Sequence, residues 1–360
     1  MKILFMCNSL HGGGAERVCV DLANGLSTLG HQVMILTDLS TRISYLPDPC
    51  VELIDAVRYK GAIRFRIDSF LRIREVLREK RPDVIISILY FNATIAKLVS
   101  WMFVQCPIIL SDHNSFERPV ERALSLRDRI NKFYLNYLYD YLTVLTEADK
   151  RYLNGRFKKV EVMPNPLAFR PVNKVLKKEK IILAVGRLDD WFYKGFDLLI
   201  KVWLAIQQDY PEWQLRIVGS GNEQSACYLR DLAQETKSIT FIPYTCEIVE
   251  EYRKASIFVL SSRYEGFGLV LTEAMSQGCA CVACDYKGRQ AEIVSDGVTG
   301  LLCPVEDEDE LADRIRKLID NPDLRMRLQE NAIHGLEHFS IGYIAHRWND
   351  LINEICGKRS

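Results

Sequence analysis

Short apolar runs rich in β-branched residues alternate along almost the whole chain with longer stretches of helical periodicity. This alternation is typical of βαβ units, which build parallel sheets covered by helices. The scheme appears twice: one set of runs extends from KILFMC (2–7) to VEVMP (160–164), and a second from KIILAVG (180–186) to ACVACD (280–285). The sequence therefore predicts an α/β protein with two parallel sheets.

The stretch between the two sets indicates a domain boundary. Residues 164–179, PNPLAFRPVNKVLKKE, contain three prolines and then a charged run, which is typical of a linker. A chain of 360 residues with 48% hydrophobic content can bury two cores. We expect domains at 1–165 and 166–341, followed by a C-terminal helix within 342–360 that has an apolar face to bury.

Charge and cysteine content narrow the expected partners. The 47 basic and 47 acidic residues cancel, so nucleic acid is not an expected partner. Residues 1–165 alone carry 23 basic and 18 acidic side chains, a net charge of +5, which would suit an anionic partner. Eleven cysteines without a disulfide-like spacing indicate a reducing, cytoplasmic location.

Two further features are interpreted as structural. Cys281 and Cys284 form a CxxC pattern, but side chains three apart on a strand point to opposite faces, so we expect core residues and not a metal site. The N-terminal MKILFMCNSL is expected to be a buried strand and not a signal peptide, and no apolar run reaches the roughly 20 residues that span a bilayer.

The stretch SRYEGFGLVLTEAMSQG (262–278) is the first candidate site. Gly266 and Gly268 let the backbone approach a ligand, and a helix predicted to begin near Leu269 would direct amide groups at a phosphate or sugar oxygen. If the residues between Glu265 and Glu273 were all helical, the two carboxylates would lie about 12 Å apart, the reach from a hexose across a diphosphate to a ribose. The alternative is a pair of solvated charges.

Two cations and two glycines follow other strands of the second half. Arg187 comes directly after the first strand, and Lys194 lies seven residues later in the sequence GRLDDWFYKG. Forked Arg187 and point-like Lys194 suit a diphosphate. Gly219 and Gly221 lie in IVGSGN, at a strand exit where doubly wound sheets bind ligands.

The N-terminal half has a glycine loop of its own, Gly12 to Gly14, directly after the first strand. As a dinucleotide fingerprint it is defective, because Arg17 stands where the third glycine belongs. In the rival interpretation, an NAD-dependent oxidoreductase, Asp38 would bind the ribose.

Together the pattern E-G-F-G-L-x-L-x-E-A, the preceding G-R-L-x5-K-G and the N-terminal G-G-G-A-E-R resemble glycosyltransferase family 4 over nearly the whole chain. This resemblance to bacterial enzymes of capsule, lipopolysaccharide or lipid-linked oligosaccharide synthesis implies the GT-B fold, two Rossmann-like domains facing each other across a cleft. The N-terminal domain would bind the acceptor and the C-terminal domain the nucleotide-sugar donor. The last helix would cross back to the first domain.

The resemblance also implies roles for the residues of the C-terminal half. Glu273 would bind the donor ribose, Glu265 the transferring sugar, and Arg187 with Lys194 the diphosphate. The remaining donor contacts would come from Gly219, Tyr244 against the base, and the backbone of Gly266, Phe267, Gly268 and Leu269.

In the N-terminal half, the resemblance implies that Gly13 and Gly14 meet the donor phosphate or the acceptor. His113 would lie against the sugar and stabilise it without attacking it, and Asn165 would lie near the cleft. The candidate catalytic residues are therefore His113, Glu265, Arg187 and Lys194.

The implied reaction moves a hexose or N-acetylhexosamine, with retention of configuration, from a nucleotide sugar, expected to carry UDP, to a lipid-linked or surface glycan. No cofactor and no metal are expected, because the two cations would replace Mn²⁺ or Mg²⁺ and we identify no carboxylate cluster of the D-x-D type suited to either ion. Besides the oxidoreductase, a non-catalytic nucleotide- or glycan-binding protein remains as an alternative. The sequence leaves the base, the sugar, the acceptor and the linkage open.

A basic segment in the N-terminal half allows two interpretations. Residues 58–81 carry nine cations against three acids, with apolar positions that include Ile67, Phe70, Leu71 and Leu77. The segment is either a solvated surface helix or an interfacial element attracted to anionic lipid on the inner face of the plasma membrane. Residues 118–142, rich in Arg and Tyr, would add to the same face.

Overall fold

The computed structural model describes residues 1–57, 65–89, 93–119, 124–157, 159–234, 236–245 and 247–357. The chain forms two compact units, which we call unit 1 (Met1–Pro166 with Phe339–Ser360) and unit 2 (Leu167–His338). The basic segment 58–81 lies partly outside the described residues, as do residues 120–123 of the tract 118–142.

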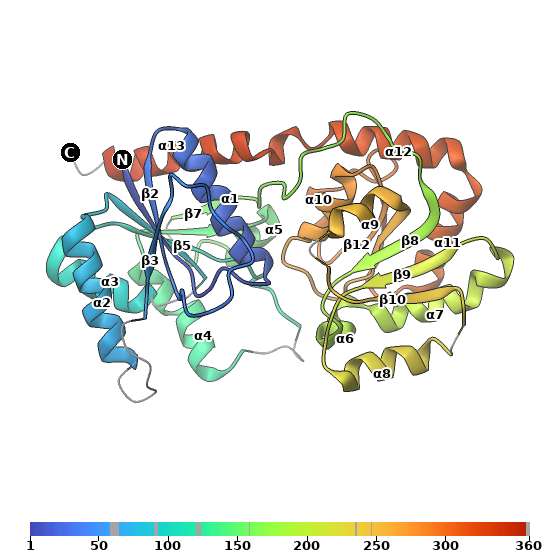
Figure 1. Ribbon diagram of the computed structural model, residues 1–360, viewed down its shortest axis with the longest axis horizontal. Helices are drawn as coiled ribbons and strands as arrows, with labels where there is room; N and C mark the ends of the chain where they lie inside the picture. The colour runs from blue at the N-terminus through green and yellow to red at the C-terminus, as the bar shows by residue number, and fades with distance from the viewer. Residues whose placement is uncertain are drawn as a thin grey trace. The chain divides into compact units, whose positions relative to one another are not determined.

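Unit 1 is built on a parallel sheet in the order β3-β2-β1-β4-β5-β6-β7 (Figure 1). Nearly every residue of its central strands is buried, as expected for a sheet covered on both faces. The strands are β1 (Lys2–Met6), β2 (Gln32–Thr37), β3 (Glu52–Asp55), β4 (Val84–Ile88), β5 (Ile108–Ser111), β6 (Tyr141–Val144) and β7 (Val160–Val162).

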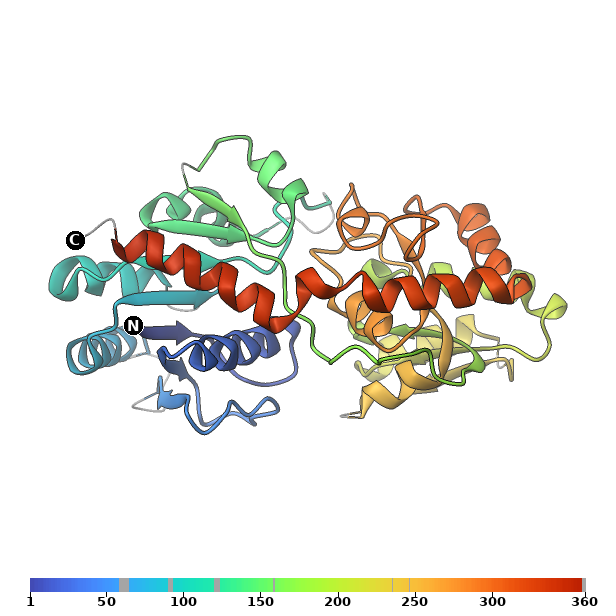
Figure 2. The same ribbon diagram turned by 90° about the horizontal axis from the view of Figure 1, so that it is seen from above.

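The helices of unit 1 cover the two faces of this sheet (Figures 1 and 2). One face packs α2, α3 and α5 against a common apolar core. On the other, α13 lies beside α1, and the contact is close because a Cβ on Gly25 of α1 would already touch Ala345 and Ile341 of α13. The elements are α1 (Gly14–Thr28), α2 (Phe65–Lys80), α3 (Ala93–Val99), the π-helix η1 (Ser100–Val104), α4 (Leu126–Phe133), η3 (Leu135–Leu138), α5 (Glu147–Leu153) and α13 (Ile341–Gly357).

Unit 2 repeats the plan with a parallel sheet in the order β10-β9-β8-β11-β12-β13. The strands are β8 (Glu179–Val185), β9 (Gln214–Val218), β10 (Ile239–Ile242), β11 (Ala255–Leu260), β12 (Ala280–Cys284) and β13 (Leu301–Cys303). In both units the strand order reverses beside the first strand, between β1 and β4 and between β8 and β11. Each unit therefore has the doubly wound, Rossmann-like topology.

The core of unit 2 is built between the sheet and the buried faces of α7, α8 and α11. The short helices η4, η5, η6 and η7 lie in the connections. The helical elements are η4 (Leu188–Asp190), α6 (Trp191–Lys194), α7 (Phe196–Ile206), η5 (Gln207–Asp209), α8 (Glu223–Leu232), α9 (Ile248–Lys254), α10 (Leu269–Ser276), η6 (Gln290–Glu292), α11 (Glu308–Asp320), α12 (Pro322–His334) and η7 (Glu337–Phe339).

The predicted parallel α/β fold is confirmed, and the predicted strands of both sheets all form. One strand, β13, was not predicted. The predicted core role of Cys281 and Cys284 is also confirmed: both are buried, and the Cys284 sulfur lies 3.6 Å from Cys303 on the neighbouring strand.

Two features of the described residues bear on metal binding and on membranes. Within the described ranges, no group of three or more His, Cys, Asp or Glu side chains is arranged to hold a metal ion. Of the helices in these ranges, none is long and apolar enough to cross a bilayer.

Candidate functional site

The switch point of unit 2 brings together two loops that are far apart in the chain. Strands β8 and β11 are hydrogen-bonded neighbours, and the loops that follow them leave the same edge of the sheet. The loop after β8 ends in Lys194, and the loop after β11 contains Glu265. The Nζ of Lys194 lies 2.6 Å from Oε2 of Glu265, and both side chains are largely buried. The structure thus pairs two predicted site residues that are 71 positions apart.

A close backbone approach makes this pair possible. Gly195, the C-cap of α6, has a φ of +65°, and a Cβ there would collide with the Ser261 carbonyl oxygen. The Ser261 hydroxyl donates to the Lys194 carbonyl at 2.9 Å. Only glycine meets both demands, which explains the Lys-Gly order in the motif.

A second ion pair, which the sequence did not predict, fastens the same two loops. Arg263 donates to both carboxylate oxygens of Asp197, at 2.6 and 3.0 Å, and to the Phe192 carbonyl at 2.7 Å. Its guanidinium also lies over the Phe192 ring, 4.4 Å from the centre. A bidentate pair of this kind fixes orientation, so Arg263 stabilises the geometry around Lys194.

The glycine-rich loop leads into α10 as predicted, because the helix begins at Leu269. Gly268, at its N-cap, has a φ of +97°, and no side chain caps the helix. Residues 265–268 are not helical, so the assumption of a continuous helix between Glu265 and Glu273 was wrong. Phe267 is buried, and its carbonyl accepts from the Gln290 side chain at 3.3 Å.

Glu273 lies on α10 and is only 9% exposed. The hydroxyl of Tyr252, a fully buried residue of α9, donates to its Oε2 at 2.8 Å. Charged side chains are seldom buried without a partner. The solvated-charge interpretation therefore does not fit Glu273.

Arg187 and Lys194 have different environments. The Arg187 side chain is 74% exposed and lies 2.6 Å from Asp190 within the same short loop. Such an exposed pair is worth little and opens easily. Arg187 can therefore turn toward a ligand, whereas Lys194 is already held in place.

The strand exits around Gly219 are close-packed. A Cβ on Gly219 would collide with the Gly186 carbonyl oxygen, so this glycine is required by the packing of β9 against β8. Tyr244 is exposed, and its amide donates to the Ser220 hydroxyl at 3.0 Å. The structure therefore places Tyr244 beside the loop that follows β9.

In unit 1, His113 follows β5 at the carboxyl edge of the sheet. Its Nδ1 lies 3.1 Å from Asn165 Oδ1, and its Nε2 lies 3.2 Å from the Ser111 hydroxyl, which accepts from Thr143 at 3.0 Å. Burial lowers the pKa of His113 to about 4. The imidazole is therefore neutral at pH 7, and the structure brings the predicted residues His113 and Asn165 together.

A buried network holds the loop that carries His113. Lys132 of α4 lies 2.9 Å from the Asp112 carboxylate and donates to the carbonyls of Asn114 and Ser115. Asp149 accepts from the amide of Phe116 at 2.9 Å. No sequence motif predicted this network, because its members come from three separate elements.

The glycine loop of unit 1 reaches the N-terminus of α1. Gly12 has a φ of +76°, and the helix begins at Gly14 after Gly13 at the N-cap. A Cβ on Gly13 would overlap the Glu16 carboxylate, so that acidic group lies over the loop. Asp38 accepts from the amide and hydroxyl of Ser40, at 2.8 and 2.6 Å, which is the contact of a turn and gives no support to a ribose site.

Family models match both halves of the chain. Residues 12–168 match the model described as Glycosyltransferase Family 4, and residues 167–335 match the model of glycosyl transferases group 1. A protein of Haemophilus influenzae named as an uncharacterized glycosyltransferase is 30% identical, over 97% of this chain and 98% of its own. A Campylobacter jejuni α-1,4-N-acetyl-D-galactosaminyltransferase, whose name includes a diphosphoundecaprenol-linked acceptor, is 28% identical over 99% of both chains.

Solved structures show the same architecture. The sucrose-phosphate synthase of Thermosynechococcus elongatus has a TM-score of 0.81 with 21% identity and covers 99% of both chains. The HepE protein of Anabaena, in complex with UDP and glucose, has a TM-score of 0.79 with 18% identity over 98% of this chain and 99% of its own.

Proposed function

The chain belongs to the glycosyltransferases, with two Rossmann-like domains of the GT-B type, and from that premise we propose that it is a retaining enzyme. It moves a hexose or N-acetylhexosamine from a UDP-sugar to a lipid-linked glycan. Residues 1–165 bind the acceptor, and residues 166–341 bind the donor.

The Lys194–Glu265 pair is the observation that carries this proposal. It lies at the switch point of unit 2, where doubly wound sheets bind nucleotides. The Lys194 ammonium has three donors, so it can keep Glu265 and also bind a phosphate oxygen. Glu265, an acceptor paired with Lys194, suits the hydroxyls of the transferring sugar.

Charge stabilisation supplies the chemistry. As the bond between sugar and diphosphate breaks, negative charge accumulates on the leaving nucleotide. Lys194, the exposed Arg187 and the amides at the uncapped start of α10 are donors suited to that charge. Because these groups are cationic or polar donors already, we propose that transfer needs no metal ion, and activity should persist in a chelator.

His113 orients the sugar in this proposal. A neutral imidazole hydrogen-bonds with one nitrogen as donor and the other as acceptor, and its contacts with Asn165 and Ser111 set its direction. Same-face substitution, which retains the anomeric configuration, needs no enzyme nucleophile. His113 therefore stabilises the sugar without forming a bond to it.

The proposed class of acceptor is inferred from the names of the relatives. Two Campylobacter jejuni relatives carry names with a diphosphoundecaprenol-linked substrate, at 28% and 23% identity. An Erwinia amylovora relative, at 28% identity, is named for amylovoran biosynthesis. We therefore propose a lipid-linked acceptor at a membrane surface, used in the synthesis of a surface polysaccharide.

A surface of unit 1 fits such a membrane. The predicted apolar positions of α2 are divided: Leu77 is fully buried and Phe70 packs against the same cluster, whereas Ile67 and Leu71 are exposed. The exposed apolar residues instead continue from α2 onto η1, and we call this set the π-helix surface. It comprises Ile67, Leu71, Trp101, Met102 and Phe103.

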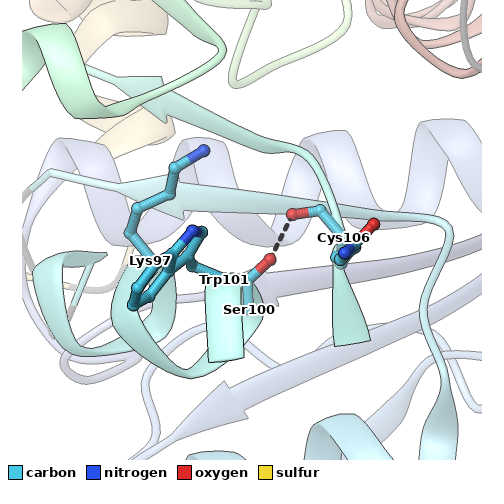
Figure 3. Close-up of a pocket in the computed structure, with 5 residues that line it drawn as sticks. Lys97, Ser100, Trp101 and Cys106 are labelled. Carbon is cyan, nitrogen blue, oxygen red and sulfur yellow. Dashed lines mark hydrogen bonds between the residues drawn. The ribbon is translucent and has the colours of Figure 1, made fainter. Parts of the chain in front are cut away.

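Cations and a cavity border the π-helix surface. The guanidinium groups of Arg74 and Arg78 lie 4.8 and 5.2 Å from the centre of the Phe103 ring. Trp101, which is 76% exposed, and Lys97 line an open cavity of about 460 Å³ (Figure 3). Exposed aromatic residues flanked by arginines are typical of an interface with anionic lipid, so we propose that this surface meets the membrane.

The donor test is a thermal-shift panel with UDP, GDP, ADP and NAD. A ligand at a hundred times its dissociation constant stabilises a protein by about 2.7 kcal/mol. We expect UDP to raise the melting temperature of the wild type, less in Glu273→Gln, and as much as before in the control Glu330→Gln on the exposed side of α12. Stabilisation by NAD, or by none of the four, would refute the donor site. Proton spectra of the product made from a UDP-sugar would then report the anomeric configuration.

The membrane test is co-sedimentation with vesicles. We expect the wild type to sediment with vesicles of anionic phospholipid and not with neutral ones. Trp101→Ser should weaken this binding, whereas Tyr343→Ser, which removes an exposed aromatic from α13, should not. Equal binding by the wild type and Trp101→Ser would exclude the π-helix surface.

A further inference from the structure

The sequence motif includes Glu273 but not Tyr252, although the two side chains are in buried contact. Tyr252 belongs to α9 and Glu273 to α10, and their side chains meet 21 positions apart through one hydrogen bond of 2.8 Å. The tyrosine is fully buried and the carboxylate nearly so. A buried charge needs such a donor, but the choice of a tyrosine hydroxyl also fixes where the carboxylate points.

Tyr252 is held rigidly on all sides. Its ring packs against Phe258 and Phe169, with centroids 5.9 and 6.3 Å away. Its carbonyl accepts from the Lys178 ammonium at 3.0 Å and from the Cys279 thiol at 3.0 Å. With both backbone and ring fixed, the hydroxyl has one position, and it determines that of Glu273 Oε2.

The hydroxyl is a permanent donor. Burial, together with the neighbouring Glu273 carboxylate, raises the pKa of Tyr252 well above its usual value, so the proton stays on the phenol. A carboxylate has about four lone-pair sites on its two oxygens. One bond from Tyr252 thus orients Glu273 and leaves it able to accept from a ligand.

We propose that Tyr252 is a positioning residue that holds Glu273 as the acceptor for the ribose hydroxyls of the donor and so sets the preference for ribonucleotides. The inference rests on the proposed function, because it assumes that the donor ribose reaches Glu273. A carboxylate fixed in advance loses little entropy when two neighbouring hydroxyls bind it. Without the bond from Tyr252, the ligand would have to supply more of the ordering of this carboxylate.

The test compares ribose and deoxyribose ligands on two tyrosine variants. Tyr252→Phe removes one hydroxyl and keeps the ring. Tyr210→Phe is the matched control, because the Tyr210 hydroxyl also donates to a carboxylate of unit 2, Asp320, at 3.0 Å. The ligands are UDP, 2′-deoxy-UDP and 3′-deoxy-UDP, titrated by calorimetry, with melting temperature as the check on folding.

For the wild type we expect UDP to bind more tightly than at least one deoxy form. Tyr252→Phe should weaken UDP about tenfold, the scale of a lost hydrogen bond to a charged group, and should weaken that deoxy form much less. Tyr210→Phe should change neither.

Three results would overturn the proposal in distinguishable ways. Equal losses for UDP and both deoxy forms in Tyr252→Phe would make Tyr252 a structural residue only. Equal binding of the three ligands by the wild type would show that Glu273 does not bind the ribose, but it would not contradict the donor site. Failure of the wild type to bind any of them would overturn the proposed function together with the inference.

Discussion

A largely buried ion pair such as Lys194–Glu265 leaves an uncompensated charge when one partner is removed. Lys194→Met should therefore disturb Glu265 as well as remove a donor to the diphosphate. Removal of one electrostatic donor from an active site costs about 10²–10³-fold in rate, and we expect a loss of kcat/KM on that scale with a UDP-sugar.

The control for Lys194 is Lys180→Met, which breaks an exposed pair with Glu212 at the start of β8. Steady-state kinetics should show no change in this variant. If Lys194→Met retained wild-type kcat/KM, Lys194 would have no part in donor binding or transfer.

The pKa of His113 predicts a window of acid sensitivity. Burial lowers this pKa from its ordinary 6.5 to about 4 in the folded protein, so between these values the unfolded chain takes up a proton that the folded chain refuses. This residue therefore lowers the free energy of unfolding as pH falls from about 6.5 to 4 and has no such effect at pH 7 and above. His113→Gln should remove this component, which urea titrations of both proteins between pH 4 and 8 would measure.

If the difference in stability between wild type and His113→Gln did not vary with pH in that window, the imidazole would not be held neutral. A proton NMR titration of the folded wild type gives a direct check, because His113 should titrate near pH 4.

The pKa of Asp21 on α1 predicts the opposite dependence of stability on pH. Burial raises the pKa of this carboxyl from 3.8 to about 6 despite Arg17 at 3.7 Å. The folded protein binds the extra proton, so this group's contribution to stability is full below about pH 4 and is lost as pH rises through 6. Asp21→Asn should raise the free energy of unfolding at pH 8 by roughly 1–3 kcal/mol and change it little at pH 3.5.

Denaturant unfolding of Asp21→Asn at the two pH values provides the measurement. A variant that is less stable than the wild type at pH 8 would mean that the Arg17–Asp21 pair outweighs the cost of burying the charge.

On the scale of elements, the turns that end α6 and α1 contain glycines, Gly195 and Gly30, that are required for different reasons. Gly195 and Gly30 both have positive φ, +65° and +85°. A Cβ on Gly30 would meet nothing within 4 Å, whereas one on Gly195 would collide with the Ser261 carbonyl. Gly30→Ala should cost only about 1–2 kcal/mol for the left-handed backbone, and Gly195→Ala distinctly more, as measured by chemical denaturation.

Gly195→Ala should also reduce donor binding, since the shift it forces moves the loop that carries Lys194. Equal destabilisation by the two alanine variants would show that the loops after β8 and β11 separate without cost.

The elements themselves were largely predictable, because short apolar strands and amphipathic helices are local patterns. The orientation of α2 was not predictable, because a helix with apolar residues on two sides does not reveal which side meets the core. In α2, Leu77 turned out to face the core and Ile67 the solvent.

On the scale of the whole molecule, each unit has a core of its own. A substitution that weakens one core should therefore destabilise that unit and not the other. Trp348 of α13 is buried in unit 1, and Trp203 of α7 is buried in unit 2. Replacing a buried tryptophan by alanine costs about 3–5 kcal/mol. Trp348→Ala should speed amide hydrogen exchange in residues 1–166, and Trp203→Ala in residues 167–338.

The two variants serve as each other's control. If either one sped exchange to the same extent in both ranges, the units would unfold together as one cooperative body.

The sequence by itself determined the family, the parallel α/β class and the identity of most candidate residues, because motifs and hydrophobic periods are short-range properties of the chain. Only the tertiary structure decided which residues meet. Lys194 pairs with Glu265, Tyr252 with Glu273 and His113 with Asn165 across separations of 71, 21 and 52 positions. These contacts depend on strand order and on how closely neighbouring loops pack, and no local pattern records either.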